Sequence, residues 1–324
     1  MSKAIRFHRL GGPEVLELDN VEVGAPGPGQ ARLRHTYVAV NFIDVYFRTG
    51  RYPTPLPSGL GSDAVGVVEA VGEGVTDVKV GDRVGYLLGP QGAYSDVRVM
   101  PAEVLIPLPA GVSDRAAATL MMKGMTAQYL VRQVFPLHGG ETILYHAAAG
   151  GVGLVACQWA RALGVTMIGT VGSDEKAALA RANGCTHTIV YTREDFVART
   201  KELTGGKGVP VVYDGVGKDT FPASLDCLAP RGLFVSFGNA SGPVPPFSLM
   251  LLAQKGSLFA TRPTLATFTA DRAGMARMAD EMFALVKEGK LRSEARQRFA
   301  LKDAAAAHRA LEARGTTGAT VLLP

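Results

Sequence analysis

The stretch TILYHAAAGGVGLVACQWARALG, from Thr142 to Gly164, decides the fold of this chain. It begins with an apolar run at 143–145, continues through a turn of small residues at 146–153 and ends in a long apolar segment with helical character. A strand, a glycine-rich turn and a helix in this order predict a phosphate-binding unit, because backbone N–H groups and the positive end of the helix face the same anion. The expected G-x-G-x-x-G pattern occurs here as Ala148-x-Gly150-x-x-Gly153.

The remaining glycines of this turn supply the positions that a dinucleotide requires. The second glycine of such a motif lets the pyrophosphate approach the backbone, and the third lets the helix pack closely on the strand. Gly150 and Gly153 fill these two positions, with Gly151 and Val152 between them, and alanine is the smallest replacement for the first glycine. Because an expected strand precedes the motif and an expected helix follows it, we predict dinucleotide binding rather than a purely structural turn.

The chain changes character near residue 124. Before this point, short β-rich runs such as QARLRHTYVAV (30–40) alternate with Gly and Pro, which predicts a small barrel or sandwich interrupted by a helix in 41–50. After it, βαβ alternation predicts a parallel sheet with strands at 143–145, 167–171, 188–191, 211–213 and 233–237. A helix in 303–315 and a closing strand in 318–324 resemble the part of the chain before residue 124. We therefore expect an α/β protein with a doubly wound Rossmann sheet at 124–284 and a β-rich domain formed by 1–123 and 285–324.

Composition indicates a globular protein with a large core. Hydrophobic residues make up 47% and charged residues 19%, and no apolar stretch is long enough for a membrane span. The three cysteines, Cys157, Cys185 and Cys227, are too few and too scattered for a disulfide framework, and the N-terminus has no signal-peptide core, so we expect a cytoplasmic protein. The net charge of +5 fits an anionic small ligand, and the chain lacks the dense basic runs with interleaved aromatics that favour a nucleic-acid partner.

The end of the second expected strand indicates which dinucleotide is bound. An NAD site places an acid there to hold the ribose 2′-hydroxyl, but Thr170, Val171 and Gly172 are not acidic. The missing acid favours NADP, whose 2′-phosphate Ser173, Lys176 and Tyr191 could contact. Two alternatives stand beside this interpretation. Ser173 could instead cap the following helix, and Asp174 is an acid that would favour NAD.

Several segments occur along nearly the full chain in the order of one family: GGPEVLEL (11–18), NFIDVYFRTGRYP (41–53), HAAAGGVGLVACQWARALG (146–164), VVYDGVG (211–217), VSFGNASG (235–242) and TRPTL (261–265). On these segments the chain resembles the quinone oxidoreductases of the zinc-free medium-chain dehydrogenase/reductase superfamily, which include bacterial NADPH:quinone reductases and relatives of zeta-crystallin. The resemblance implies a GroES-like catalytic domain, a Rossmann domain and a cleft between them. It also implies a cofactor turn of the form Ala147-x-x-Gly150-x-x-Gly153, and a homodimer paired through an edge strand at 256–263.

A metal is not expected. Zinc relatives in the superfamily have a ligand cysteine near the position of Asn41 and a Gly-His pair where this chain has Leu60 and Gly61, which leaves Asp63 as the one possible ligand. Without a Lewis acid, a quinone or an alkene conjugated to a carbonyl is easier to reduce than a simple ketone, because hydrogen bonds can stabilise the delocalised charge.

Candidate residues for the acceptor site lie in NFIDVYFRTGRY (41–52). We expect Asn41 and Asp44 to share a helix face, with Asn41 as donor to the acceptor oxygen and Asp44 in a catalytic or a structural role. Tyr46 and Tyr52 could stack on a planar ring, donate protons or pack in the core. The resemblance adds Arg262 as a cleft arginine. It also implies that Lys123, Thr126 and Arg314 contact the cofactor. The loop after the fifth strand should lie near the nicotinamide, because ligands bind at the carboxyl ends of the strands. The full expected cofactor-binding set is Phe42, Lys123, Thr126, Tyr129, Gly150, Gly151, Val152, Gly153, Gly172, Ser173, Lys176, Tyr191, Phe237, Gly238, Asn239 and Arg314.

These observations favour an NADPH-dependent quinone oxidoreductase that acts without a metal on a small, planar, electron-poor acceptor. The alternative on the same scaffold is an NADPH-dependent 2-alkenal or enoyl reductase with a tyrosine as proton donor. A third hypothesis, from another class, is a crystallin-like or nucleic-acid-binding protein that retains the cofactor.

Overall fold

The computed structural model describes the whole chain, Met1–Pro324, which forms two compact units. Unit 1 consists of Met1–Met125 and Asp271–Pro324, and unit 2 consists of Thr126–Ala270. None of the helices combines the length and hydrophobicity that crossing a bilayer requires.

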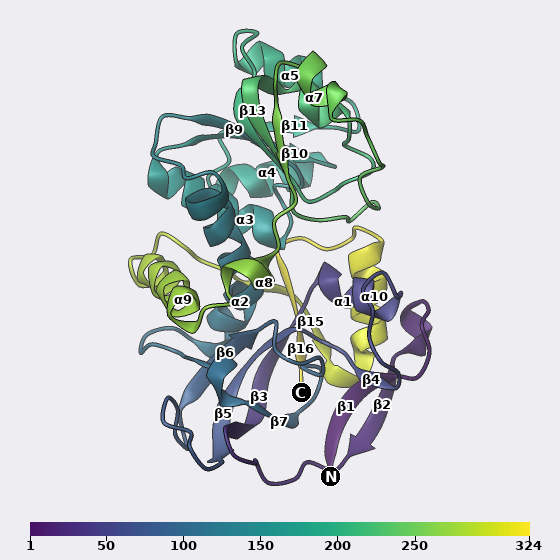
Figure 1. Ribbon diagram of the computed structural model, residues 1–324, viewed down its shortest axis with the longest axis vertical. Coiled ribbons are helices and arrows are strands. Elements are labelled where there is room, and N and C mark those ends of the chain that lie inside the picture. Colours follow the sequence, from purple (N-terminus) through teal and green to yellow (C-terminus); the bar gives the residue numbers. More distant parts are fainter. The chain divides into compact units, whose positions relative to one another are not determined.

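Unit 2 is built on a six-stranded parallel sheet in the order β11-β10-β9-β12-β13-β14. Numbered from β9, this is the 3-2-1-4-5-6 order of a Rossmann sheet, with the reversal between β9 and β12. Figure 1 labels strands β9, β10, β11 and β13 of this sheet. All five strands that the sequence predicted are present, and the predicted edge segment contains the sixth, at the edge. Their bounds are β9 Thr142–Tyr145, β10 Thr166–Val171, β11 His187–Val190, β12 Val209–Asp214, β13 Leu228–Ser236 and β14 Phe259–Thr261.

The helices of unit 2 follow from local sequence signals. α3, Gly151–Leu163, buries most of its length, and it ends at Gly164, whose φ of 75° permits the left-handed cap that terminates helices. Apolar side chains from the central strands, including Leu144, Ile168 and Val212, form the core of the unit. The other helices of the unit are α4 Asp174–Ala182, α5 Phe196–Leu203, α6 Ala223–Asp226, α7 Met250–Gln254 and α8 Leu265–Phe268.

Unit 1 contains two sheets. The larger has the order β15-β16-β3-β5-β6-β8, with β7 paired to β3, and the smaller has the order β2-β1-β4. The predicted closing strand is confirmed as β16, which runs antiparallel to β3 and so joins the C-terminal segment to the N-terminal one. The strands are β1 Ser2–Phe7, β2 Glu17–Val21, β3 Gln30–Val40, β4 Ser58–Gly59, β5 Asp63–Val71, β6 Arg83–Leu87, β7 Val97–Pro101, β8 Ile106–Pro107, β15 Ala295–Ala300 and β16 Ala319–Leu323.

Four α-helices belong wholly or mainly to unit 1: α1 Phe42–Arg48, α2 Asp114–Tyr129, α9 Arg272–Lys287 and α10 Ala304–Glu312. The expected boundary at 284–285 placed α9 in the Rossmann domain, whereas its contacts place it in unit 1. Met282 of α9 packs so closely on Gly124 that a Cβ there would lie 2.3 Å from its sulfur, and Arg272 forms an ion pair with Asp77 at 3.1 Å. No local sequence pattern indicates these long-range partners.

Candidate active site

The predicted dinucleotide turn makes its tight bend at Ala147. This residue has a φ of 56°, a left-handed conformation that glycine adopts without cost and alanine adopts with some strain. The N–H of Gly150 donates to the Ala147 carbonyl at 2.9 Å, and the N–H of Ala148 donates to the Thr170 carbonyl at 3.0 Å. The bend therefore lies one residue before Ala148, the position of the first glycine in the G-x-G-x-x-G pattern.

Gly153 provides the close packing that the motif requires. A Cβ at this position would lie 2.4 Å from the Ala147 oxygen and 2.6 Å from the Ala148 oxygen, so only glycine fits. Gly150 is extended and precedes the first turn of α3, whose leading N–H groups have no partner within the helix. Small residues surround these N–H groups, and the turn therefore fits the pyrophosphate of a dinucleotide.

Buried polar side chains, joined by hydrogen bonds, support the dinucleotide turn. The Asp214 carboxylate accepts a hydrogen bond from the Ser224 hydroxyl at 3.0 Å, and His146 Nε2 lies 3.0 Å from the same hydroxyl oxygen. Since Asp214 and the Thr220 carbonyl, 3.0 Å from the same hydroxyl, only accept, the Ser224 proton is directed to one of them, Nε2 carries the imidazole proton and Nδ1 accepts from the Thr170 hydroxyl at 2.9 Å. Burial lowers the pKa of His146, in agreement with a neutral ring. The sequence pattern did not identify these residues as support for the turn, although polar residues at the ends of apolar strands were a signal for it.

The end of β10 brings four predicted residues together. A Cβ on Gly172 would lie 2.9 Å from the Tyr191 hydroxyl, and the Ser173 hydroxyl accepts from the backbone N–H of Lys176 at 3.3 Å. Ser173 therefore caps α4, as one of the two interpretations expected. Asp174, the rival support for NAD, forms hydrogen bonds of 2.6 and 2.7 Å with Arg193, and these hold the pKa of its carboxyl below the usual range. Its charge is thus already paired within unit 2.

The other predicted residues of unit 2 lie on three different segments. Tyr129 is buried near the end of α2 and stacks on Phe268 with ring centroids 4.7 Å apart, and Thr126 lies one helical turn earlier. Phe237 follows β13 and packs on Gly215, where a Cβ would lie 2.9 Å from its ring; Gly238 and Asn239 continue this loop. Arg262 follows β14, is exposed, and donates to the carbonyl of Pro263 at 3.0 Å.

In unit 1, the predicted donor Asn41 is held between two opposite charges. Its Nδ2 donates to the Asp63 carboxylate at 2.6 Å, and its Oδ1 accepts from the Lys123 ammonium at 2.7 Å. These contacts fix which end of the amide carries the nitrogen, because a carboxylate only accepts and an ammonium only donates. The second Nδ2 hydrogen makes no hydrogen bond to the chain. The site therefore presents one oriented N–H donor.

Asp63 and Lys123 are both buried. Burial raises the pKa of Asp63 and lowers the pKa of Lys123, and the attraction between the two charges opposes both shifts. The Asp63 carboxylate also accepts from the backbone N–H of Met122 at 3.2 Å. Sequence analysis considered Asp63 only as a metal ligand and missed its pairing with Asn41. An acid at the start of a mostly apolar strand was the available signal.

Asp44 lies in the first turn of α1 and is completely buried. Its carboxylate accepts from the Asn41 backbone N–H at 2.9 Å, from the Ser62 hydroxyl at 2.7 Å and from the Tyr94 hydroxyl at 3.0 Å. Burial raises its pKa to about 7 despite these donors. Asn41 itself has extended backbone and precedes the helix, so the expectation that both residues share a helix face is wrong.

The remaining predicted residues of unit 1 include an aromatic group. Tyr46 is buried and meets Tyr52 edge-to-face at 5.4 Å, and Phe42 lies 6.5 Å from Tyr46 between ring centroids. The edges and faces of these aromatic rings can contact a planar ligand. Arg314 is exposed, follows α10 and has a φ of 56°.

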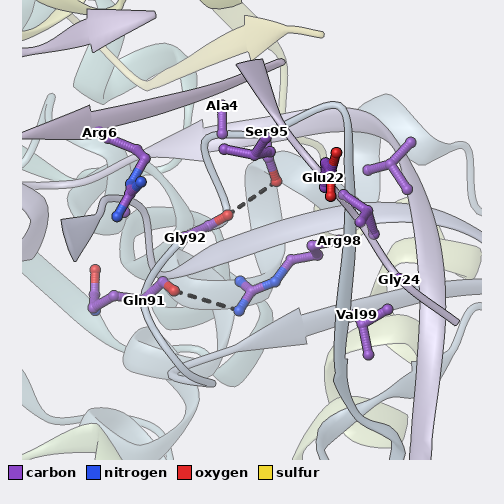
Figure 2. A pocket seen from close by; sticks show the side chains of 13 residues that line it. Ala4, Arg6, Glu22, Gly24, Gln91, Gly92, Ser95, Arg98 and Val99 are labelled. Carbon is purple, nitrogen blue, oxygen red and sulfur yellow. Dashed lines mark hydrogen bonds between the residues drawn. The ribbon is translucent and has the colours of Figure 1, made fainter. Parts of the chain in front are cut away.

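Two further features of unit 1 contain none of the predicted site residues. A pocket of about 330 Å³ lies beside β1 and β7. Two hydrogen bonds join residues that line it: Arg98 donates to the carbonyl of Gln91, and Ser95 donates to that of Gly92 (Figure 2). The exposed group His8, Glu17 and Asp19 places three possible metal-ligand atoms within 4.8 Å of one another on the β1–β2 hairpin. Neither feature involves the dinucleotide turn or Asn41.

Comparisons with known proteins agree with this arrangement. Residues 27–110 match the family model described as the alcohol dehydrogenase GroES-like domain, and residues 151–279 match the one described as zinc-binding dehydrogenase. The chain is 58% identical to a quinone oxidoreductase of Pseudomonas aeruginosa, with 100% of both chains covered. It is 48% identical to a 2-haloacrylate reductase of Burkholderia, covering 100% of this chain and 99% of that protein. A crystal structure of Escherichia coli quinone oxidoreductase complexed with NADPH superposes with a TM-score of 0.98 at 47% identity, over 99% of this chain and 100% of that one.

Proposed function

Because the chain belongs to the quinone oxidoreductase family of the medium-chain dehydrogenase/reductase superfamily, we propose that it transfers reducing equivalents from NADPH to a quinone. The observation that carries the proposal is the amide of Asn41, which Lys123 and Asp63 hold with one N–H free. A donor fixed in advance stabilises an oxygen on which negative charge develops, and it does so without reorganisation during the reaction.

Each unit has a separate task in this proposal. In unit 2 the N–H groups at the start of α3 bind the pyrophosphate, and the segment from Gly172 to Lys176, with Tyr191, binds the adenosine 2′-phosphate. When bound, NADPH supplies the hydride. In unit 1 Asn41 donates to the acceptor oxygen, the rings of Tyr46 and Tyr52 contact its planar face, and Phe42 and Lys123 contact the cofactor. Thr126, Tyr129, the Phe237–Asn239 loop, Arg262 and Arg314 complete the proposed binding residues.

The donor set of unit 1 supports a reaction without zinc. Zinc requires ligands with free lone pairs, usually three from the protein at a catalytic site. Here the Asn41 oxygen is occupied by the Lys123 ammonium, and a divalent ion beside Asp63 would have to displace this buried cation. At Gly61 any side chain is excluded, because a Cβ would lie 2.2 Å from the Tyr94 ring.

A second candidate function is the reduction of an alkene conjugated to a carbonyl or carboxylate. The 48% identity to a 2-haloacrylate reductase favours it, since that name describes such a substrate. The two reactions differ in their proton requirement. An alkene needs a proton at carbon, whereas the reduced oxygen of a quinone is comparatively acidic and needs little help.

Steady-state turnover with a quinone, an enal and a 2-haloacrylate in parallel, with NADPH and with NADH, tests the proposal. We expect the quinone with NADPH to be preferred, and Tyr46→Phe and Tyr52→Phe each to keep most of this turnover because the ring remains. A quinone rate at background, together with a loss of about 10²- to 10⁴-fold in one variant on the alkene, would favour the second function.

The same proposal covers assembly and location. β14 is the edge strand of the unit 2 sheet, and Phe259 on it is 60% exposed, which supports pairing with a second copy into a homodimer. Light scattering at micromolar concentration tests it, and a monomer would contradict it. The three unpaired cysteines support a reducing compartment such as the cytoplasm.

A further inference from the structure

A continuous hydrogen-bonded chain connects the C-terminal helix α10 to the proposed acceptor site. Arg48 Nη1 lies 2.9 Å from His308 Nδ1, and His308 Nε2 lies 3.0 Å from the Tyr94 hydroxyl. That hydroxyl reaches the Asp44 carboxylate at 3.0 Å, and Asp44 accepts the backbone N–H of Asn41. The sequence pattern did not identify His308 as part of this arrangement.

The chemistry of the groups determines the direction of every bond in the chain. A guanidinium only donates, so His308 Nδ1 accepts from Arg48 and the imidazole proton is on Nε2. Nε2–H therefore donates to the oxygen of Tyr94, and the Tyr94 proton is left to donate to Asp44. The low pKa of His308, which burial and the charge of Arg48 reduce to about 3, agrees with a neutral ring in this tautomer.

Because these polar groups are buried, each of them requires its partner in this series of hydrogen bonds. The exposed fraction is 0% for Asp44, Tyr94 and His308 and 1% for Arg48, so water cannot replace a missing partner. Gly61 has a φ of 102° and leaves room for the Tyr94 ring, which a Cβ would strike at 2.2 Å. The hydroxyl of Tyr94 is thus held at one place between α1 and α10.

We propose that Tyr94, His308 and Arg48 are positioning residues of the acceptor site. They hold the carboxyl group of Asp44, which fixes the backbone of Asn41 and hence the direction of its free amide N–H. The inference rests on the proposed role of Asn41 as donor to the acceptor. It assigns a function to the return of the C-terminal segment, since His308 lies 260 residues after Arg48.

Unit 1 offers a matched control for the test. Tyr86 is also fully buried, and its hydroxyl lies 2.9 Å from Nε2 of a second buried histidine, His35. His35 Nδ1 donates to the carbonyl of Ser95 at 2.7 Å, so Tyr86 donates to Nε2, and this pair makes no hydrogen bond to Asp44. Tyr94→Phe and Tyr86→Phe therefore remove the same group from the same kind of site, and only the first lies on the chain to Asn41.

We expect Tyr94→Phe to lower kcat with a quinone by about tenfold while the KM for NADPH stays within about twofold, because a hydrogen bond to a charged group is lost at the acceptor side alone. Tyr86→Phe should match the parent. The acidic limb of the pH–rate profile should move to higher pH in Tyr94→Phe, since the Tyr94 hydroxyl lowers the pKa of Asp44. The other charged groups that act on Asp44 are Asp63 on β5 and Lys123 on α2, while Arg48 on α1 acts on Tyr94, and all three are unchanged in both variants.

A second pair of variants tests His308. His308→Gln keeps one acceptor and one donor and should recover part of the rate that His308→Leu loses. The ¹⁵N resonance of the Asn41 side-chain amide gives a readout without turnover, and it should move in Tyr94→Phe but stay in Tyr86→Phe.

Equal kinetics, pH profiles and Asn41 resonances in the two tyrosine variants would overturn the inference. A parent enzyme without quinone activity would instead contradict the proposed function, and the resonance would still report whether the chain positions Asn41.

Discussion

Gly153→Ala should weaken NADPH binding through a collision within the dinucleotide turn itself. The added Cβ would lie 2.4, 2.6 and 2.7 Å from the Ala147 oxygen, the Ala148 oxygen and the Ala148 carbonyl carbon. All three are backbone atoms, so no side-chain rotation relieves the contact. The shortest contact falls 0.6 Å below the 3.0 Å limit of real Cβ contacts, and the turn or the start of α3 must move by at least this amount.

The size of the effect follows from this displacement. Overpacking of a well-packed site costs about 1–3 kcal/mol. If the turn moves to relieve the strain, the same free energy is lost from NADPH binding, which corresponds to roughly a 5- to 150-fold higher Kd. If the turn does not move, the strain remains and lowers the stability of unit 2 by about 1–3 kcal/mol.

Calorimetric titration with NADPH measures the change in binding. Urea unfolding, followed by the fluorescence of Trp159 in α3, measures the change in stability. Gly150→Ala separates the causes, because its Cβ meets only the Ala147 oxygen at 3.1 Å and should disturb the bound pyrophosphate more than the fold. Gly24→Ala has no atom within 4 Å and should resemble the parent in both assays. Unchanged binding and unchanged stability in Gly153→Ala would refute the reasoning.

Lys176→Ala should raise the KM for NADPH more than that for NADH, since a lost charge-assisted contact to the 2′-phosphate costs about 1.5–3 kcal/mol; equal changes with both cofactors would count against the assignment. Exhaustive chelation should leave turnover intact, and elemental analysis should find far less than one zinc per chain; a stoichiometric zinc whose removal abolishes activity would contradict this. Lys123→Met should destabilise unit 1 by about 3–5 kcal/mol at pH 8, because it leaves the Asp63 charge buried without its partner. A carboxyl with a raised folded-state pKa costs stability above that pKa and none once it is protonated, so the loss should shrink as the pH falls. Urea midpoints measured across the pH range check this, and a loss independent of pH would be inconsistent with it.

Short-range patterns predicted the fold because each of its signals lies within a few residues. The alternation of apolar strands and helices after residue 124 predicted five strands of the Rossmann sheet, and the closing helix and strand predicted the return of the C-terminus to unit 1. Gly150 and Gly153 identified the turn by the space that a pyrophosphate and a close helix require. The glycine pattern did not predict that the left-handed bend occurs at Ala147, since an alanine, unlike a glycine, does not indicate a residue with positive φ.

The sequence by itself determined that a dinucleotide turn exists and that Asn41 is a candidate donor. Only the tertiary structure decided how that donor is held: Asp63 lies 22 residues from it, Lys123 lies 82 residues from it, and Tyr94 and His308 lie 214 residues apart. Hydrogen bonds between such distant residues leave no periodic trace in the chain, because nothing local requires their partners. They form because burial removes water from each polar group and leaves only the groups that the fold brings within reach.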